Sequence, residues 1–135
     1  MTGVVVVGDP GPPREEIARA LARTPDIRLL GSLDGRRPVA AALTALAPAV
    51  TVLVEPATSL LPAALIREAR AAVPTGVVIV RAAEATPTWV AEALNAGATT
   101  VLPATVDAEA LGRVVTEIAA ETDTADEALR LGWAA

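Results

Sequence analysis

The chain of 135 residues contains no cysteine, histidine, phenylalanine or tyrosine, and only two tryptophans, Trp89 and Trp133. Without cysteine there is no disulfide, no thiolate nucleophile and no cysteine-ligated zinc. Without histidine there is no imidazole base and no imidazole metal ligand. A hard cation held by carboxylates alone is the metal site that this composition still allows.

Long hydrophobic runs and excess positive charge are also missing. Hydrophobic residues make up 53% of the chain, yet no apolar run reaches the roughly 18 residues that indicate a membrane span. Residues 1–9 lack the basic start and long apolar stretch of a signal peptide. The net charge of −5 argues against broad attraction to nucleic acid. We therefore expect a cytoplasmic protein that neither crosses a membrane nor binds nucleic acid through this domain.

Short β-branched runs alternate with alanine-rich stretches of helical periodicity. Strands are predicted at 4–7, 27–33, 50–54, 76–80 and 99–102. Helices are predicted from residue 12 to Pro25, at 38–46, 61–73 and 87–96, and after Asp107. Strict alternation of strand and helix indicates a parallel sheet covered on both faces, with right-handed crossovers. The predicted fold is α/β and flavodoxin-like, a (βα)5 sandwich with strand order 2-1-3-4-5.

Several residues are predicted to begin or end helices. Thr86 and Asp107 are suited to cap helix starts, and Gly97 suits a left-handed helix end. The inner stripe of the fourth helix is predicted to be Val90, Ala93 and Leu94, with Trp89 partly off it.

The last residues depart from the alternating pattern. They are acidic at first and then contain Leu129, Leu131 and Trp133. We predict a domain at 1–121 and an acidic tail or the start of a linker at 122–135. The alternative is a short helix that docks on this domain or on a partner.

Several phrases, in order, resemble response-regulator receiver domains between residues 4 and 120. They are Pro25-Asp26-Ile27 to Asp34-Gly35, Pro48-Ala49-Val50-Thr51-Val52-Leu53-Val54 and Glu92-Ala93-Leu94-Asn95-Ala96-Gly97-Ala98. In that family the strand ends form an acidic pocket that holds a divalent cation and accepts a phosphoryl group. A carboxylate needs a metal and a lysine to neutralise charge before it can attack a phosphoryl dianion.

This chain departs from that pocket at nearly every position. The resemblance places the degenerate pocket at Gly8, Asp9, Val54, Glu55, Arg81 and Ala104. Val54 stands where the resemblance implies the acceptor aspartate, and Ala104 where it implies the lysine. Val101 stands at the position of the aromatic switch residue. We therefore predict no catalytic residue, no metal and no cofactor, which makes an enzyme using Asp9, Glu55 and a cation the least favoured class.

Two charged residues of this edge suggest further hypotheses. Arg81 could pair with Asp9 and replace the lost cation, or it could point into solvent. Glu55 could mimic an acidic acceptor, although strand alternation turns it away from the acceptor's direction.

Three other features have ordinary explanations. Gly8-Asp9-Pro10-Gly11 could suggest nucleotide binding, but the prolines that follow remove phosphate-binding amides. A solvated face is the simplest interpretation of four arginines, Arg14, Arg19, Arg23 and Arg28. The Trp89 ring either covers its own domain or anchors an interface.

A narrower resemblance is to the N-terminal domain of actinobacterial CpaE/TadZ-type pilus assembly proteins. It is carried by Val7-Gly8-Asp9-Pro10, Leu65-Ile66-Arg67-Glu68-Ala69, Gly76-Val77-Val78-Ile79-Val80, Ala96-Gly97-Ala98 and Leu102-Pro103. In that family such a domain precedes an ATPase whose G-x-x-x-x-G-K-[ST] loop this sequence lacks.

The resemblance implies a non-catalytic domain that binds proteins or dimerises to localise a type IV/Tad pilus assembly ATPase. The predicted contact face is the fourth helix, fifth strand and last helix, with interface candidates Trp89, Val101 and Arg113. The alternative is a phosphorylation-independent input domain of an atypical response regulator that controls transcription.

Overall fold

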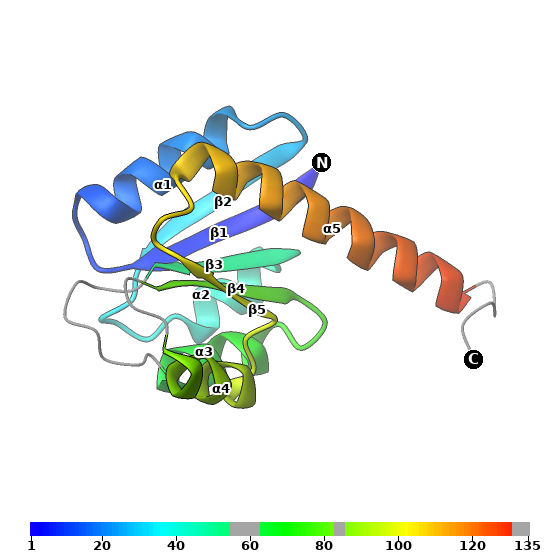
Figure 1. Cartoon of the computed structure of the whole chain (residues 1–135). Coiled ribbons are helices and arrows are strands. Elements are labelled where there is room, and N and C mark those ends of the chain that lie inside the picture. Colours follow the sequence, from blue (N-terminus) through cyan, green and yellow to red (C-terminus); the bar gives the residue numbers. More distant parts are fainter. Residues whose placement is uncertain (55–62, 83–85, 131–135) are drawn as a thin grey trace.

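The computed structural model describes residues 1–54, 63–82 and 86–130, with side chains described up to residue 121. Five parallel strands form one sheet in the order β2-β1-β3-β4-β5 (Figure 1). The strands are β1 (Thr2–Gly8), β2 (Ile27–Asp34), β3 (Val50–Val54), β4 (Val77–Ala82) and β5 (Thr100–Pro103). The helices are α1 (Pro12–Arg23), α2 (Ala40–Leu46), α3 (Ala63–Ala72), α4 (Pro87–Ala96) and α5 (Ala108–Arg130). The predicted fold class and strand order are confirmed.

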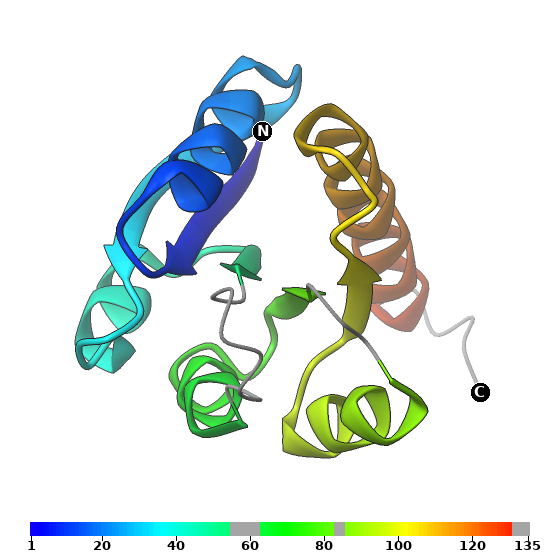
Figure 2. The ribbon, with the colours of Figure 1, turned by 60° about the vertical axis from the view of Figure 1, so that its left-hand side comes forward.

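Each face of the sheet has its own hydrophobic core, because successive strand residues point to opposite sides. Val4 and Val6 of β1 join a cluster with α1 and α5, whereas Val5 and Val7 join a cluster with α2, α3 and α4. Figure 2 shows α1 and α5 together on one side of the sheet and the other three helices opposite. Strand β3 is the third of the five strands and is buried along its whole length. Its end therefore lies at the middle of the sheet edge.

The predicted helix signals act as expected at α4 and α5. The Thr86 hydroxyl accepts from the Trp89 amide at 3.2 Å, and the Asp107 carboxylate accepts from the Ala110 amide at 2.7 Å. Gly97 ends α4 with a φ of 122°, a backbone conformation that side chains disfavour. These local features fix the start and the end of α4 and the start of α5.

Helix α2 begins at Ala40, two residues later than predicted, and its cap comes from another helix. Val39 at the N-cap position has no side-chain acceptor. Glu68 of α3 supplies one instead, because its Oε1 accepts from the Val39 and Ala40 amides at 2.7 and 2.8 Å. The start of α2 is therefore set by a tertiary contact, which no local signal could indicate.

Helix α5 has 23 residues and is the longest of the described helices. Its last turns run past the end of the sheet toward the C-terminus (Figure 1). The predicted boundary between residues 121 and 122 falls inside this helix, and the linker role of the segment after it stays a prediction. Leu131 and Trp133 lie outside the described residues.

Candidate functional site

The carboxyl ends of all five strands meet along one edge of the sheet. One register row crosses this edge through Asp34, Gly8, Val54, Arg81 and Leu102, from β2 to β5. Ligands of open α/β sheets bind at this kind of edge, near the point where the strand order reverses. The structure thus brings the predicted positions Gly8, Val54 and Arg81 into one row, while Glu55 lies outside the described residues.

Gly8 is packed closely against the end of β3. A Cβ atom there would lie 3.1 Å from both the Cβ and the carbonyl oxygen of Val54. The next residue, Asp9, is the acid that the receiver resemblance places after the first strand. It is exposed and lies outside this close contact.

Val54 is an apolar end to the central strand. It is 6% exposed and belongs to the core cluster shared with α1 and α5. A branched hydrocarbon in this position offers neither a nucleophile nor a metal ligand. Phosphoryl transfer through residue 54 is therefore chemically excluded.

Arg81 turns toward the loop between β5 and α5. Its Nη2 donates to the Ala104 carbonyl at 3.0 Å, and its Nε donates to the Val106 carbonyl at 3.3 Å. The Ala104 amide in turn donates to the Ala82 carbonyl at 2.8 Å. The end of β4 and the start of the loop are thus joined by three hydrogen bonds.

The hypothesis that Arg81 pairs with Asp9 is wrong, and so is the alternative that it simply faces solvent. Within residues 1–54, 63–82 and 86–121, the ion pairs join Asp34 to Arg36 and Arg37, and none joins Asp9 to Arg81. The reason is strand order, because β3 separates β1 from β4 and leaves about 10 Å between their backbones. The neighbouring loop after β5 is closer to the guanidinium.

Asp34 forms a charge cluster that sequence reasoning missed. Arg36 donates to its carboxylate from the backbone amide, Nε and Nη2 at 2.9, 3.1 and 3.1 Å. Arg37 adds an ion pair at 3.7 Å. The hydrogen bonds from Arg36 lower the pKa of Asp34 to about 2. The signal is present in the sequence as Asp34-Gly35-Arg36-Arg37, an acid followed closely by two bases.

The charge of Asp9 also contributes to this cluster. The pKa of Arg36 is raised, first by its hydrogen bond with Asp34 and to a smaller extent by the charge of Asp9. The charged groups of this edge are divided between the β2 side and the β5 side, with Gly8 and Val54 between them.

Arg14 does not belong to the solvated arginine face in which it was placed. It is partly buried, and its Nη1 donates to the Gly8 carbonyl at 3.2 Å. Its Nε is buried without a hydrogen-bond partner among the described residues. Arg19, Arg23 and Arg28 are exposed, as expected.

The interface candidates lie on different sides of the molecule. Trp89 and Val101 are partly buried and pack against the core cluster beneath α2, α3 and α4. Arg113 is exposed on α5 and lines a surface hollow with Arg23, Thr24 and Pro25 beside α1. The structure therefore does not bring Arg113 together with the other two, and their part in an interface stays a prediction.

The predicted inner stripe of α4 is partly wrong. Ala93 and Ala96 are buried and Trp89 packs beside them, at the i, i+4 and i+7 positions of one helix face. Leu94 instead points outward and is 46% exposed. The Trp89 ring thus covers its own domain, and Leu94 becomes the outward hydrophobic residue of the helix.

Two negative findings apply to the described part of the chain. Its side chains form no cluster of three or more acidic residues that could hold a metal ion. None of the helices described in residues 1–54, 63–82 and 86–130 has the length and apolar character that crossing a membrane requires.

The chain is similar in structure to several solved proteins. No protein-family model and no curated protein matches the chain. The signal receiver domain of the response regulator NarL from Mycobacterium tuberculosis is 27% identical, with a TM-score of 0.71 over 86% of this chain and 94% of that one. A pilus assembly-related protein from Burkholderia pseudomallei is 18% identical, with a TM-score of 0.70 over 89% of this chain and 90% of that one. The pilus assembly protein CpaE from Burkholderia thailandensis is 19% identical, with a TM-score of 0.67 over 90% of this chain and 99% of that one.

The chain has the flavodoxin-like receiver fold. Its structural neighbours include receiver domains of response regulators and pilus assembly proteins. The sequence resemblance implies phosphoryl chemistry at the strand ends, where this chain has Gly8, Val54 and an Arg81 that is bonded to the loop after β5. The scaffold is thus shared with the neighbours, and the side chains at its edge set this chain's chemistry.

Proposed function

We propose that this chain is a non-catalytic receiver-fold domain that works through contacts with other proteins. The observation that carries the proposal is Val54, an apolar residue at the end of the central strand where the fold would present its acceptor. Arg81 supports it, because its bonds to the loop after β5 already hold that loop without a bound phosphoryl group. Such a domain would need no cofactor and no metal.

A titration tests the non-catalytic part of the proposal. Magnesium and beryllofluoride together imitate the cation and phosphoryl group of a phosphorylated receiver. We expect no saturable heat when both are added to the 135-residue chain, since Asp9 is the acid that remains among the described pocket positions. Saturable heat that Asp9→Asn removes would contradict the proposal and favour the cation-dependent class.

The contact face that we propose consists of α4, β5 and α5. Strand β5 is at the edge of the sheet and is only partly covered, and edge strands are natural sites of association. Leu94 adds an outward hydrophobic side chain from α4. Self-association through this face is expected to weaken with Leu94→Arg, measured by analytical ultracentrifugation, and to survive the nearby exposed substitution Glu92→Arg. Equal behaviour of the two variants would remove α4 from the face.

We further propose that the domain localises a type IV/Tad pilus assembly ATPase in the cytoplasm. Support comes from the sequence resemblance and from two pilus assembly structures that share the fold. In the native cell, Leu94→Arg at the chromosomal locus should reduce surface pilin and disperse a fluorescently tagged assembly ATPase, while transcript levels stay constant. Glu92→Arg is the matched control.

The second candidate is a phosphorylation-independent input domain that controls transcription. The 27% identity to the NarL receiver favours it, since that value exceeds those of the two pilus assembly structures. The same Leu94→Arg strain separates the candidates. Altered transcripts with normal pilin would support transcription control, and lost pilin with unchanged transcripts would support pilus localisation.

A further inference from the structure

The two edges of the sheet differ in how far they are open to another strand. Strand β5, at one edge, has four residues and ends at Pro103, which has no backbone N–H to donate. Strand β2, at the other edge, has eight residues, and none of them is a proline. No strand of the described residues lies on its outer side (Figure 2). Strand β2 is therefore the edge that offers the longer pairing surface.

The middle of β2 lacks the features that usually protect an open edge. Native proteins protect such edges with proline or charged side chains, whereas residues 29–33 read Leu-Leu-Gly-Ser-Leu. A register shift against β1 leaves Leu30 as an extra residue on β2, and regular pairing resumes from Gly31 to Asp34. An added strand thus has a regular stretch of four residues, Gly31–Asp34, on which to pair.

Backbone amides of this stretch point away from the sheet. The Gly35 amide donates to the Gly8 carbonyl of β1 at 3.0 Å, so it faces the sheet. Successive amides of a strand point alternately to its two sides. The Leu33 amide therefore faces β1 as well, and the Ser32 and Asp34 amides face outward. Because Ser32 is exposed, its amide is within reach of a second backbone.

Helix α2 lies beside this strand and brings no charge to it. The helix contains only alanine, leucine and threonine. It approaches β2 at Gly31, where a Cβ would lie 3.4 Å from Leu46 Cδ1. The exposed residues of the helix have short side chains: Ala40, Ala41, Thr44 and Ala45. An apolar side chain of an added strand would therefore meet the half-buried Leu46 across Gly31.

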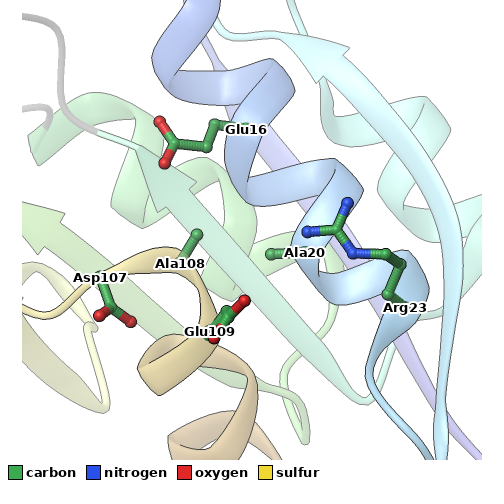
Figure 3. Close-up of a pocket in the computed structure, with 6 residues that line it drawn as sticks. All are labelled: Glu16, Ala20, Arg23, Asp107, Ala108 and Glu109. Carbon is green, nitrogen blue, oxygen red and sulfur yellow. The ribbon is translucent and has the colours of Figure 1, made fainter.

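An uncharged surface is not general for this chain. A hollow of about 240 Å³ between α1 and α5, for example, has four charged side chains around it (Figure 3), those of Glu16, Arg23, Asp107 and Glu109. The outer edge of β2 and the adjoining surface of α2 are therefore better suited than the α1–α5 hollow to apolar contacts.

Positive charge lies at both ends of the uncharged stretch. Arg28 precedes it and is exposed, and Arg37 follows it with a side chain that is 83% exposed. The acid at the end of the strand, Asp34, already forms an ion pair with Arg36 at 3.1 Å. Residues 26–37 carry three arginines and two aspartates, so this segment is net positive in a chain whose net charge is −5.

We propose that the outer edge of β2 binds an extended segment of a partner protein, which adds a strand to the sheet. The segment is apolar in its middle, where it meets Leu46, and acidic at its ends, opposite Arg28 and Arg37. Main-chain hydrogen bonds supply the affinity in this mode of recognition. Complementary charge selects the partner and fixes its register.

This inference names a kind of partner for the proposed protein-binding role and rests on it. It uses a surface other than the α4–β5–α5 face, because β2 and β5 are at opposite edges of the sheet.

A synthetic peptide tests strand addition. The probe is the acetylated and amidated peptide Asp-Val-Thr-Val-Thr-Val-Asp, which is added to the ¹⁵N-labelled 135-residue chain. We expect saturable NMR shift changes at residues 28–37 and cross-strand contacts from the peptide backbone to Ser32.

Two substitutions at one position test the backbone contact. Ser32→Pro removes the outward amide and spares the pairing with β1, since proline is tolerated where an edge strand faces solvent. Ser32→Ala is the matched control, because it shortens the same side chain and keeps the amide. We expect Ser32→Pro to weaken peptide binding by about five- to tenfold and Ser32→Ala by less than about twofold. Thermal unfolding shows whether each variant is folded.

Charge reversal tests the ends of the segment without changing the strand backbone. Arg28→Glu with Arg37→Glu should weaken binding of this peptide and strengthen binding of a second peptide whose two aspartates are replaced by lysines. Arg19→Glu with Arg113→Glu, exposed on α1 and α5, is the control and should change neither affinity.

Three results would overturn the proposal. They are no saturable binding at millimolar peptide, shift changes centred on another surface, or equal binding to folded Ser32→Pro and Ser32→Ala. If the chain alone dimerises in sedimentation equilibrium and Ser32→Pro abolishes the dimer, the edge binds a second copy and the proposed partner segment is wrong.

Leu94→Arg separates this inference from the proposed function. It should leave peptide binding unchanged, because Leu94 lies on α4. If no peptide binds while Leu94→Arg still weakens self-association, the β2 edge is refuted and the α4–β5–α5 face stands. If the peptide binds at β2 while Leu94→Arg has no effect on self-association, the α4–β5–α5 face is refuted and the β2 edge stands.

Discussion

On one face of the sheet, Arg70 of α3 makes five hydrogen bonds, whereas on the other face α1 and α5 meet through small residues. The Arg70 guanidinium donates to carbonyls of Pro74, Gly76 and Gly97 and to the Thr99 hydroxyl. Glu68 of the same helix caps α2. Two charged side chains of α3, Arg70 and Glu68, therefore hold the α2–α3–α4 face together through hydrogen bonds within the domain.

The charged side chains of the α1–α5 face are arranged differently. Its helices approach closely at Gly112 and Thr24. Apart from the partly buried Arg14, the described charged side chains of the two helices are exposed, and no described ion pair joins them: Glu15, Glu16, Arg19, Arg23, Glu109, Arg113, Glu117 and Glu121. Charged side chains of the same fold can therefore either hold helices together or remain exposed on the surface.

The largest effect is expected at Arg70. Arg70→Met should lower the free energy of unfolding by about 2–4 kcal/mol, because several charged hydrogen bonds are lost and the carbonyls of Gly76 and Gly97 lose a donor. Urea denaturation measures the change. Arg67→Met, exposed on the same helix, is the control and should be nearly neutral. Similar losses for both variants would contradict the fastening role of Arg70.

A smaller effect is expected at Arg81, which fastens the loop before α5. Arg81→Met should lower the free energy of unfolding by about 1–2 kcal/mol through the loss of its two carbonyl contacts. Hydrogen exchange at residues 104–107 should become faster, while exchange in β1 stays the same. Arg28→Met is the control, because Arg28 is exposed on the edge strand β2. Unchanged exchange in the loop would show that Arg81 does not hold it.

The close contact of α1 with α5 predicts that the effect of Gly112→Ala on stability depends on the residue at position 24. Gly112→Ala should destabilise the fold by about 1–2 kcal/mol, because its Cβ would collide with the Thr24 hydroxyl, which is bonded to the Ala20 carbonyl. With Thr24→Ala already present, the same change should stabilise by up to about 1 kcal/mol through helix propensity. A double-mutant cycle from thermal and urea unfolding measures the coupling. Additive effects would disprove the collision.

The smallest effect on stability is expected at Asp34. Its pKa, about 2, lies below the ordinary 3.8. The charged carboxylate therefore stabilises the fold at pH values above 3.8, and this stabilisation is lost as the pH falls from 3.8 toward 2. In an NMR titration, Arg36→Gln should raise the Asp34 midpoint toward 3.8, whereas Arg28→Gln should leave it unchanged. A midpoint near the ordinary value in the unaltered chain would contradict the Arg36 contact.

Local signals predicted most of the fold. Alternating runs of β-branched residues and alanine-rich helices gave the parallel order, and Thr86, Gly97 and Asp107 act at the helix ends as expected. These features depend on residues close in sequence, so they can be recognised there. The start of α2 could not, because its acceptor, Glu68, is 28 or more residues away.

The candidate site was predictable in position and less so in contacts. Strand ends placed Gly8, Val54 and Arg81 at one edge. The partner of Arg81 depended on which strand lies beside β4, and the Asp34–Arg36 pair depended on the turn after β2. Leu94, predicted on the inner face of α4, points outward, and Trp89, predicted partly off that face, packs on the core. The reason is that the orientation of a short helix is set by the core it packs against.

The element order, the parallel sheet and the identity of the residues at the strand ends can be derived from the sequence, because composition and periodicity are local properties. Two features follow from the tertiary structure alone: Arg81 bonds to the loop after β5, and charged residues of α1 and α5 lie side by side on one surface. Both depend on which distant segments become neighbours. That choice follows from burying two hydrophobic faces of one sheet at once.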